Sequence, residues 1–405
     1  MVNTILTPTA VTREALRVLH QKLNFIGNIN RNYDASFAKD GAKIGSALKI
    51  RLPNEYTVRT GATLTTQDTA EISTTLNVTT QKGVDTTFTS ADLTLALQDF
   101  SERILKPSMT VLAAAMESDA LTMVLDVYNL IDNTGTSITF QQTMLARKKL
   151  VDSLAPPDGK WKALLNTQDT VDLVNALKGL FQDSSAIKEQ YREGSMGRTA
   201  SFDFYETTLL ANTTSGTTSA TNNWTVNSSV TVSATTGTTA LDLINNTGPQ
   251  GTLVVGDVFT ITGLNRVHPE TKVDTGNLQQ FVVTAAVAAS SATSVSFQPT
   301  IFMTGGRQNV TSTVLTTKAI VKIGNTSALY KPSLFYHPDA FTFASADLVL
   351  PRGTDMAARE VQDGISMRMV RDFVITSDAF PTRFDVIYGF KAMRPQLAAR
   401  VISGS

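Results

Sequence analysis

The composition of the chain changes abruptly at Asn212 and changes back near Tyr330, and this break constrains the fold more than any other feature. Residues 212–239 are mostly Thr, Ser, Asn, Gly and Ala, and short alternating segments separated by turn residues continue to about residue 323. The expected strands are 224–226, 230–232, 252–255, 258–262, 281–287, 295–297 and 319–323. Short strands at this spacing, with no helical periodicity among them, are typical of a β-barrel or β-sandwich. We therefore predict an all-β domain over 212–330, inserted into an α/β chain, with its two ends close in space.

The residues before this insertion predict helices, a strand and one long hairpin. Thr7-Pro8 is a typical helix start, and apolar residues recur at helical spacing up to Gly27-Asn28, which gives an amphipathic arm. Its apolar stripe is equally consistent with packing on its own domain or on a neighbour. Residues 45–89 alternate and are rich in Thr, which predicts a hairpin-like excursion too polar to form a core. The other expected elements are a helix from about 90, capped by Ser90-Ala91-Asp92, to Ile131 with Pro107 inside it, a helix over 143–154, a strand over 162–165, and a helix with Thr167 as N-cap.

Charge and cysteine content limit the possible functions. Lys plus Arg and Asp plus Glu both number 35, so the formal net charge is zero. Proteins that bind DNA tightly by neutralising phosphates usually carry a basic excess, so only weak, non-specific contact with DNA is expected. Cysteine is absent, which excludes disulfides and thiol catalysis. The first residues lack the basic and apolar regions of a signal peptide, and no apolar run approaches the ~20 residues that span a bilayer. A cytoplasmic protein with no membrane partner is therefore expected.

No catalytic, cofactor-binding or metal-binding residues are predicted. The three histidines, His20, His268 and His337, have no ligand partner at metal-binding spacing, so structural roles are expected for them. The chain has no P-loop, no G-x-S-x-G elbow and no H-E-x-x-H motif. The glycine pair Gly194 and Gly197 leads into an expected strand, which is the wrong context for a phosphate site. The sequence thus offers no positive evidence for an enzyme.

Three charged residues are the candidate functional residues of the expected hairpin. Arg51, Glu55 and Arg59 follow one another at steps of four. On a single β-strand such positions share a face. A row of charges on a projecting hairpin is consistent with a solvated face or with contacts to an adjacent subunit, where opposite charges set register. We expect Arg51 and Arg59 to meet acidic side chains of a neighbouring copy.

The last third of the chain contains a closely spaced series of motifs without a catalytic group. Within it, 383–389 alternates charged and apolar residues before a glycine, as a half-buried strand entering a turn does. The series is Phe335-Tyr336-His337-Pro338-Asp339-Ala340-Phe341, Leu348-Val349-Leu350-Pro351-Arg352-Gly353, Arg383-Phe384-Asp385-Val386-Ile387-Tyr388-Gly389 and Arg394-Pro395-Gln396-Leu397-Ala398-Ala399-Arg400. In order and spacing it resembles the end of the major capsid (coat) proteins of tailed bacteriophages.

Two further segments carry the same resemblance. Gly194-x-x-Gly197-Arg198, leading to Phe202-Asp203-Phe204-Tyr205, is similar to the motif before the inserted domain of such proteins. The segment 263–272, followed by 276–283, is similar to part of the inserted β-domain in coat proteins of short-tailed Salmonella phages. The order of arm, hairpin, long helix, α/β unit, β insertion and closing strands also matches, so the resemblance covers nearly the whole chain.

The resemblance implies an α+β fold of the tailed-phage and herpesvirus capsid type. It implies an N-terminal arm over 1–35, a first core part over 36–211, the inserted domain over 212–330 and a second core part over 331–405. The first core part would hold the extended loop (45–89), a spine helix (90–131) and an axial domain from about 150. Hexamers and pentamers of the chain would form an icosahedral shell around double-stranded DNA, assembled in the host cytoplasm with a scaffolding protein and a portal. Some relatives cross-link a Lys to an Asn, but nothing marks Lys82 as reactive, and no cross-link is expected.

Other classes of protein remain open on sequence grounds. A decoration or tail-tube protein would also be neutral and free of cysteine, but it should lack the long helix. A secreted, β-rich surface-layer protein would explain the Thr-rich segment, but it should carry a targeting signal. An enzyme would require a catalytic constellation that the motifs do not supply.

Overall fold

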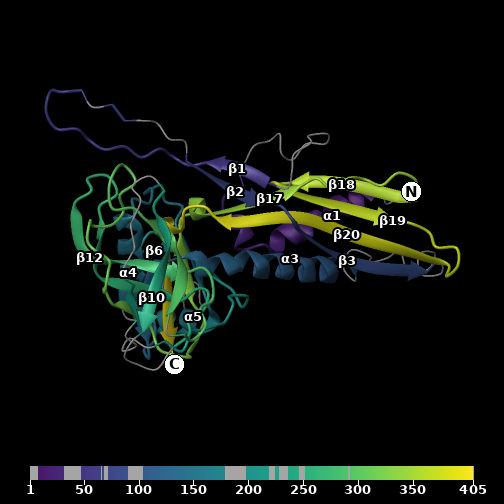
Figure 1. Ribbon diagram of the computed structural model, residues 1–405. Helices are drawn as coiled ribbons and strands as arrows, with labels where there is room; N and C mark the ends of the chain where they lie inside the picture. Colours follow the sequence, from purple (N-terminus) through teal and green to yellow (C-terminus); the bar gives the residue numbers. More distant parts are fainter. Residues whose placement is uncertain are drawn as a thin grey trace. The chain divides into compact units, whose positions relative to one another are not determined.

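The structure is a computed structural model, and it describes residues 8–31, 47–64, 66–67, 72–89, 104–177, 198–218, 224–227, 236–245, 251–290 and 292–404. The chain forms two compact units (Figure 1). Unit 1 comprises 1–51, 73–121 and 341–393, and unit 2 comprises 52–72, 122–340 and 394–405. Helices and mainly antiparallel strands occur together, as the expected α+β class requires.

Unit 1 is built around one long strand, β20 (Ala379–Ala392). It pairs antiparallel with β3 (Thr80–Thr89), β17 (Phe341–Ala346) and β19 (Ile365–Arg371), and β19 pairs in turn with β18 (Met356–Gln362). The helix α3 (Lys106–Leu121) runs alongside β3 and β20 (Figure 1). Tyr388 of β20 joins the two layers, since its hydroxyl donates to the Asp119 carboxylate of α3 at 2.6 Å.

The sequence correctly predicted the strand over 383–389 but wrongly predicted a turn at Gly389. β20 continues through this glycine, which lies opposite Ala344 of β17. A Cβ atom at Gly389 would lie 2.0 Å from the carbonyl oxygen of Asn77. The glycine is therefore required because another backbone segment approaches closely, and not because the chain turns.

The arm helix α1 (Pro8–Lys22) starts at Pro8, as expected, and packs within its own chain. Its buried face, which includes Ala15, Val18 and Leu19, contacts α3, β18 and β19. Of the two interpretations left open by the sequence, packing on its own domain is therefore the one observed for this stripe. The helix ends at Lys22, and a short 3-10 turn, η1 (Ile26–Asn28), follows.

The expected hairpin over 45–89 is divided in the structure. β1 (Ala47–Arg51) and β2 (Ser73–Asn77) pair in antiparallel register and form a two-stranded stem in unit 1. β3 instead belongs to the main sheet through its pairing with β20. The part of the expected hairpin between β1 and β2 is therefore the segment 52–72, which we call the loop segment.

The helix predicted to extend to Ile131 ends earlier. α3 stops at Leu121, continues as a 3-10 turn, η3 (Thr122–Asp126), and is followed by the strand β4 (Leu130–Thr134). The expected start near residue 90, with its cap, lies outside the described residues. The stretch Lys106–Asp126 is long and apolar enough to cross a membrane by length and composition, although the sequence suggested no such run. Half of its window is buried inside the protein.

An α/β layer forms the first part of unit 2. Its sheet has the order β4, β21 (Ala398–Gly404), β16 (Ser333–Tyr336), β5 (Lys162–Leu165), β7 (Phe202–Glu206) and β6 (Arg198–Thr199). The helix α4 (Phe140–Asp152) begins where the Gln142 side chain accepts the Thr139 N–H at 3.0 Å. The helix α5 (Thr167–Leu177) is capped by Asn166 and not by Thr167, since Asn166 Oδ1 accepts the Asp169 N–H at 2.8 Å.

The segment 212–330 contains a second six-stranded sheet. Its order is β14 (Ile320–Lys322), β11 (Val258–Val267), β12 (Asp274–Val283), β13 (Ala292–Ile301), β10 (Thr238–Asn245) and β9 (Trp224–Val226). Phe259, Phe281 and Phe297 pack against one another in its core. The expected strand 252–255 is only an isolated bridge between Leu253 and Val287, and the expected strand 230–232 lies outside the described residues.

Candidate functional sites

The loop segment carries two of the three predicted site residues. Arg51 is the last residue of β1, and no strand continues to Glu55 or Arg59. The prediction that all three share one strand face is therefore wrong, because the chain leaves the sheet after Arg51. The Arg59 side chain instead forms local hydrogen bonds. It donates to the carbonyl oxygen of Gly61 and, at 3.1 Å, to that of Thr63.

The base of the loop segment lies against two connections between strands of its own unit, the one after β13 at Gly306 and the one after β11 at Lys272. A Cβ atom at Gly306 would lie 2.6 Å from the Glu55 carbonyl oxygen. Burial lowers the pKa of Lys272, and the Glu55 carboxylate opposes that shift. Further along, the segment exposes large apolar side chains, namely Tyr56, Val58 at 93% and Leu64 at 78% exposure. Glu55 thus contributes to an intrachain contact, while the apolar side chains beyond it face solvent in the single chain.

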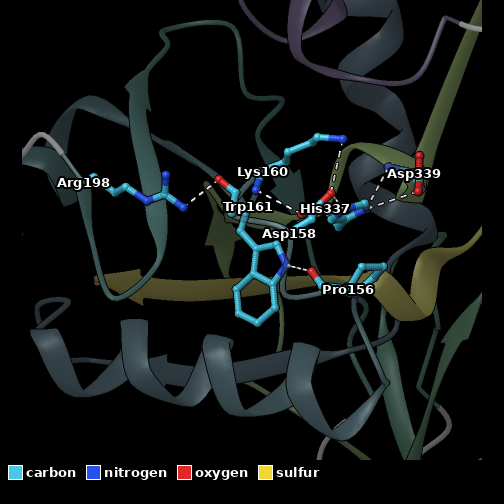
Figure 2. A network of polar contacts seen from close by, with 8 residues as sticks. Pro156, Asp158, Lys160, Trp161, Arg198, His337 and Asp339 are labelled. Atoms are coloured by element: carbon cyan, nitrogen blue, oxygen red, sulfur yellow. Dashed lines mark hydrogen bonds and ion pairs between the residues drawn. The ribbon is translucent and has the colours of Figure 1, made fainter.

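A second polar site surrounds His337, in the first of the closing motifs (Figure 2). The His337 ring is buried, and its Nε2 lies 3.3 Å from both carboxylate oxygens of Asp158. The backbone N–H of Asp339 donates to Nδ1 at 3.2 Å. Because Nδ1 accepts, Nε2 is the nitrogen that carries the proton and donates it toward Asp158.

Several hydrogen bonds stabilise the turn that contains Asp158 (Figure 2). Burial raises the pKa of Asp158, but the Lys160 N–H and His337 outweigh it, so the pKa lies below its usual value. Trp161 Nε1 donates to the Pro156 carbonyl oxygen at 2.7 Å, and Arg198 donates to the Gly159 carbonyl oxygen at 2.6 Å. The network connects the turn before β5 to the short 3-10 helix η4 (Pro338–Ala340). A buried histidine with fixed partners is a structural element, and no reacting group adjoins it in the described part of the chain.

Several buried carboxylates, among them Glu117 and Asp385, were not identified from the sequence. Glu117 of α3 is 2% exposed and accepts the backbone N–H groups of Phe25 at 3.0 Å and Ile26 at 2.9 Å. Burial raises its pKa to about 7, although these hydrogen bonds oppose the shift. Asp385 of β20 is buried between Arg368 at 2.6 Å and Arg383 at 2.8 Å. An acid directly after the apolar run Val111–Met116 was the available signal for Glu117.

The other candidate groups are engaged in structural contacts. Lys82 Nζ lies 2.7 Å from the Asp119 carboxylate. His20 Nε2 lies 2.8 Å from Asp363, and His268 Nδ1 accepts the Glu270 N–H at 3.3 Å. Among the described residues, no group of three or more His, Cys, Asp or Glu side chains could hold a metal ion. The glycine motif at 194–197 lies outside the described residues.

Comparison with known proteins decides the family. A family model described as "P22 coat protein - gene protein 5" matches residues 9–404. The chain belongs to the P22 coat protein family. The coat protein is thus a major capsid protein of a tailed bacteriophage, which confirms the resemblance and the function inferred from the closing motifs. Its family is structural and forms the capsid of the virion, so the interpretations as a decoration, tail-tube or surface-layer protein are excluded.

Solved structures similar to the coat protein include other phage proteins. One titled "Mycobacterium phage Che8" is 13% identical, with 95% of this chain and 92% of that chain covered and a TM-score of 0.47. "Capsid of Ralstonia phage GP4" is 7% identical, with 94% and 91% covered and a TM-score of 0.46. "CUS-3 coat protein I-domain" is 28% identical, with 26% of this chain and 98% of that chain covered and a TM-score of 0.20. No curated protein sequence matches the chain significantly.

Proposed function

We propose that the loop segment is the contact by which one coat-protein subunit holds the next in the shell, with Arg51, Glu55 and Arg59 at its charged edge. The observation that carries the proposal is the exposure of Tyr56, Val58 and Leu64 on a segment whose described residues form no strand. Exposed apolar side chains on a protein that forms a shell are stabilised when a neighbour covers them, by roughly 25 cal/mol per Å². Arg51 and Arg59 then set the register against acidic side chains of that neighbour.

A double charge reversal tests this contact. Arg51→Glu with Arg59→Glu should leave the subunit folded by circular dichroism but lower the yield of particles, measured by sedimentation and negative-stain microscopy. Each pair is worth only about 0.2–1 kcal/mol, but symmetry repeats it at every subunit. The matched control is Lys22→Glu with Arg352→Glu, which changes the net charge equally at two other exposed positions. A normal particle yield from the loop variant would restore the solvated-loop interpretation.

We propose further that residues 212–330 form an inserted domain between core parts 36–211 and 331–405, after an arm over 1–35. The pairing of β8 (Thr213–Thr214) with β15 (Leu329–Tyr330) supports this division, because it brings the two ends of the segment together. Buried Arg400 supports a fixed attachment, since it donates to the carbonyl oxygens of Val127 at 2.8 Å and Gly256 at 2.5 Å. The domain would thus be held against the α/β sheet from β21.

The remaining partners are part of the same proposal. The chain would assemble in the host cytoplasm into hexamers and pentamers with a scaffolding protein and a portal, and would act as a structural protein without catalysis. The absence of cysteine suits a reducing cytoplasm. The zero formal net charge supports weak, non-specific contact with packaged double-stranded DNA.

A further inference from the structure

A cavity of about 330 Å³ lies between α4 and the strands β11 and β12 of unit 2. We call it the basic pocket, because its lining includes Lys148, Lys149, Arg266 and His268 but only one acid, Asp152. Gln280 closes one side, where its side chain donates to and accepts from the backbone of Leu130.

The one acid of the basic pocket is already engaged. Asp152 pairs with Lys148 at 2.8 Å, one helical turn away on α4. This pair accounts for one cation and one carboxylate. Lys149 and Arg266 also line the cavity, and its lining holds no further carboxylate.

The two remaining cations have only neutral partners among the described residues. Lys149 Nζ donates to the amide oxygen of Gln280 at 2.9 Å. Arg266 Nη2 donates to the Asp152 carbonyl oxygen at 2.9 Å and to the Ser153 hydroxyl at 3.0 Å, at the end of α4. Burial, followed by the charges of Arg266 and Lys148, lowers the pKa of Lys149 to about 8. The nearby Asp152 carboxylate opposes this shift but does not outweigh it, so positive charge predominates around the ammonium.

We propose that the basic pocket binds an oxyanion, held by Lys149 and Arg266. The ammonium supplies a point charge, and the planar guanidinium supplies paired donors that match phosphate and carboxylate oxygens. Desolvated cations with neutral partners gain more from an anion than exposed ones do. The anion comes either from free phosphate or from an acidic side chain of a second coat-protein chain. Nothing in this proposal depends on the loop segment.

Titration of the unassembled full chain tests the first source. Isothermal calorimetry with inorganic phosphate, at constant ionic strength set by chloride, should show saturable binding. Lys149→Met, which keeps the length of the side chain, should weaken it at least tenfold, and Arg266→Gln should do the same. Lys160→Met, at a largely exposed lysine outside the pocket, is the matched control. Equal binding by wild type and both pocket variants would mean an adventitious ion only and would overturn the proposal.

Assembly distinguishes the second source. If an acidic side chain of another chain occupies the pocket, Lys149→Met should lower particle yield while circular dichroism stays unchanged, and Lys149→Arg should restore the yield because it restores the charge. Lys160→Met should assemble normally. If phosphate does not bind and Lys149→Met assembles as the wild type does, the pocket holds no oxyanion and the proposal fails.

Discussion

The carboxylate of Glu117 accepts the backbone N–H of Ile26 at 2.9 Å, which ties helix α3 to the turn that ends the arm 91 residues earlier. The contact is buried, and within the described part of the chain the carboxylate is bound by backbone N–H groups and not by a cation. A buried carboxylate that is bound only by backbone N–H groups has no cation to favour its charged form, so its protonation changes with pH.

The folded-state pKa of Glu117, about 7, lies above its ordinary value of 4.5. The folded state therefore binds the proton more tightly, so this group's contribution to stability is complete below pH 4.5 and is lost as pH rises through 7. Across that window the free energy of unfolding should fall by roughly 2–3 kcal/mol from this group. Glu117→Gln should remove that part of the pH dependence in urea unfolding, and Glu270→Gln, at an exposed position, should not. Identical pH profiles for wild type and Glu117→Gln would contradict the assignment.

Gly389→Ala should strongly destabilise unit 1. Its Cβ would meet the Asn77 carbonyl oxygen at 2.0 Å, a backbone atom that cannot rotate away. We expect a loss of about 2–4 kcal/mol in the free energy of unfolding, or insoluble protein. Gly27→Ala is the matched control, because a Cβ there meets nothing within 4 Å. Similar stability of the two variants, measured by urea unfolding, would show that β2 and β20 do not approach closely.

Residues 212–330 expressed alone should fold. Their core contains aromatic and aliphatic side chains buried within the segment itself, among them Trp224, Phe259 and Phe281. The expected result is a dispersed NMR spectrum with β-sheet shifts. Exposure of Val258 and Val282, which pack with Tyr128 and Ile402 in the full chain, should lower the stability but not abolish the fold. A random-coil spectrum would argue against the boundaries at 212 and 330.

Unassembled coat protein should bind duplex DNA only weakly. The 35 basic and 35 acidic residues leave no net charge to release counterions from the phosphates. Fluorescence anisotropy at physiological salt should give no saturation in the submicromolar range. A submicromolar Kd under these conditions would contradict the prediction. It would mean that a local basic surface binds DNA although the chain as a whole has no net charge.

The helices and strands that were predicted correctly are those whose sequence signals lie within the element itself or next to it. The helix α4, the strand β5 and most strands of the insertion follow from periodicity, caps and turn residues within a few positions. The family could be predicted because its motifs are ordered along the chain. Arg51, Glu55 and Arg59 were wrongly assigned to one strand. The alternation of residues around Arg51 does not show where strand pairing ends.

The errors arose where distant segments decide the local structure. Leu130 and Ile131 continue an apolar helical pattern, but β21 pairs with them and draws them into a sheet. Gly389 resembles a turn residue until the Asn77 backbone is placed beside it. Glu117 has no evident partner in the sequence, because its hydrogen bonds come from the distant backbone of the arm. The basic pocket likewise needs α4 and β12 in contact, which no local pattern reveals.

The order in which the protein is synthesised has a consequence for the arm. Helix α1 leaves the ribosome first, yet β18, which covers part of its buried face, begins only at Met356. At typical elongation rates the interval is on the order of 15–70 s. Until β18 has been synthesised, part of the apolar face of α1 is not buried by the chain itself. Each nascent chain therefore exposes an aggregation-prone apolar surface during most of its translation.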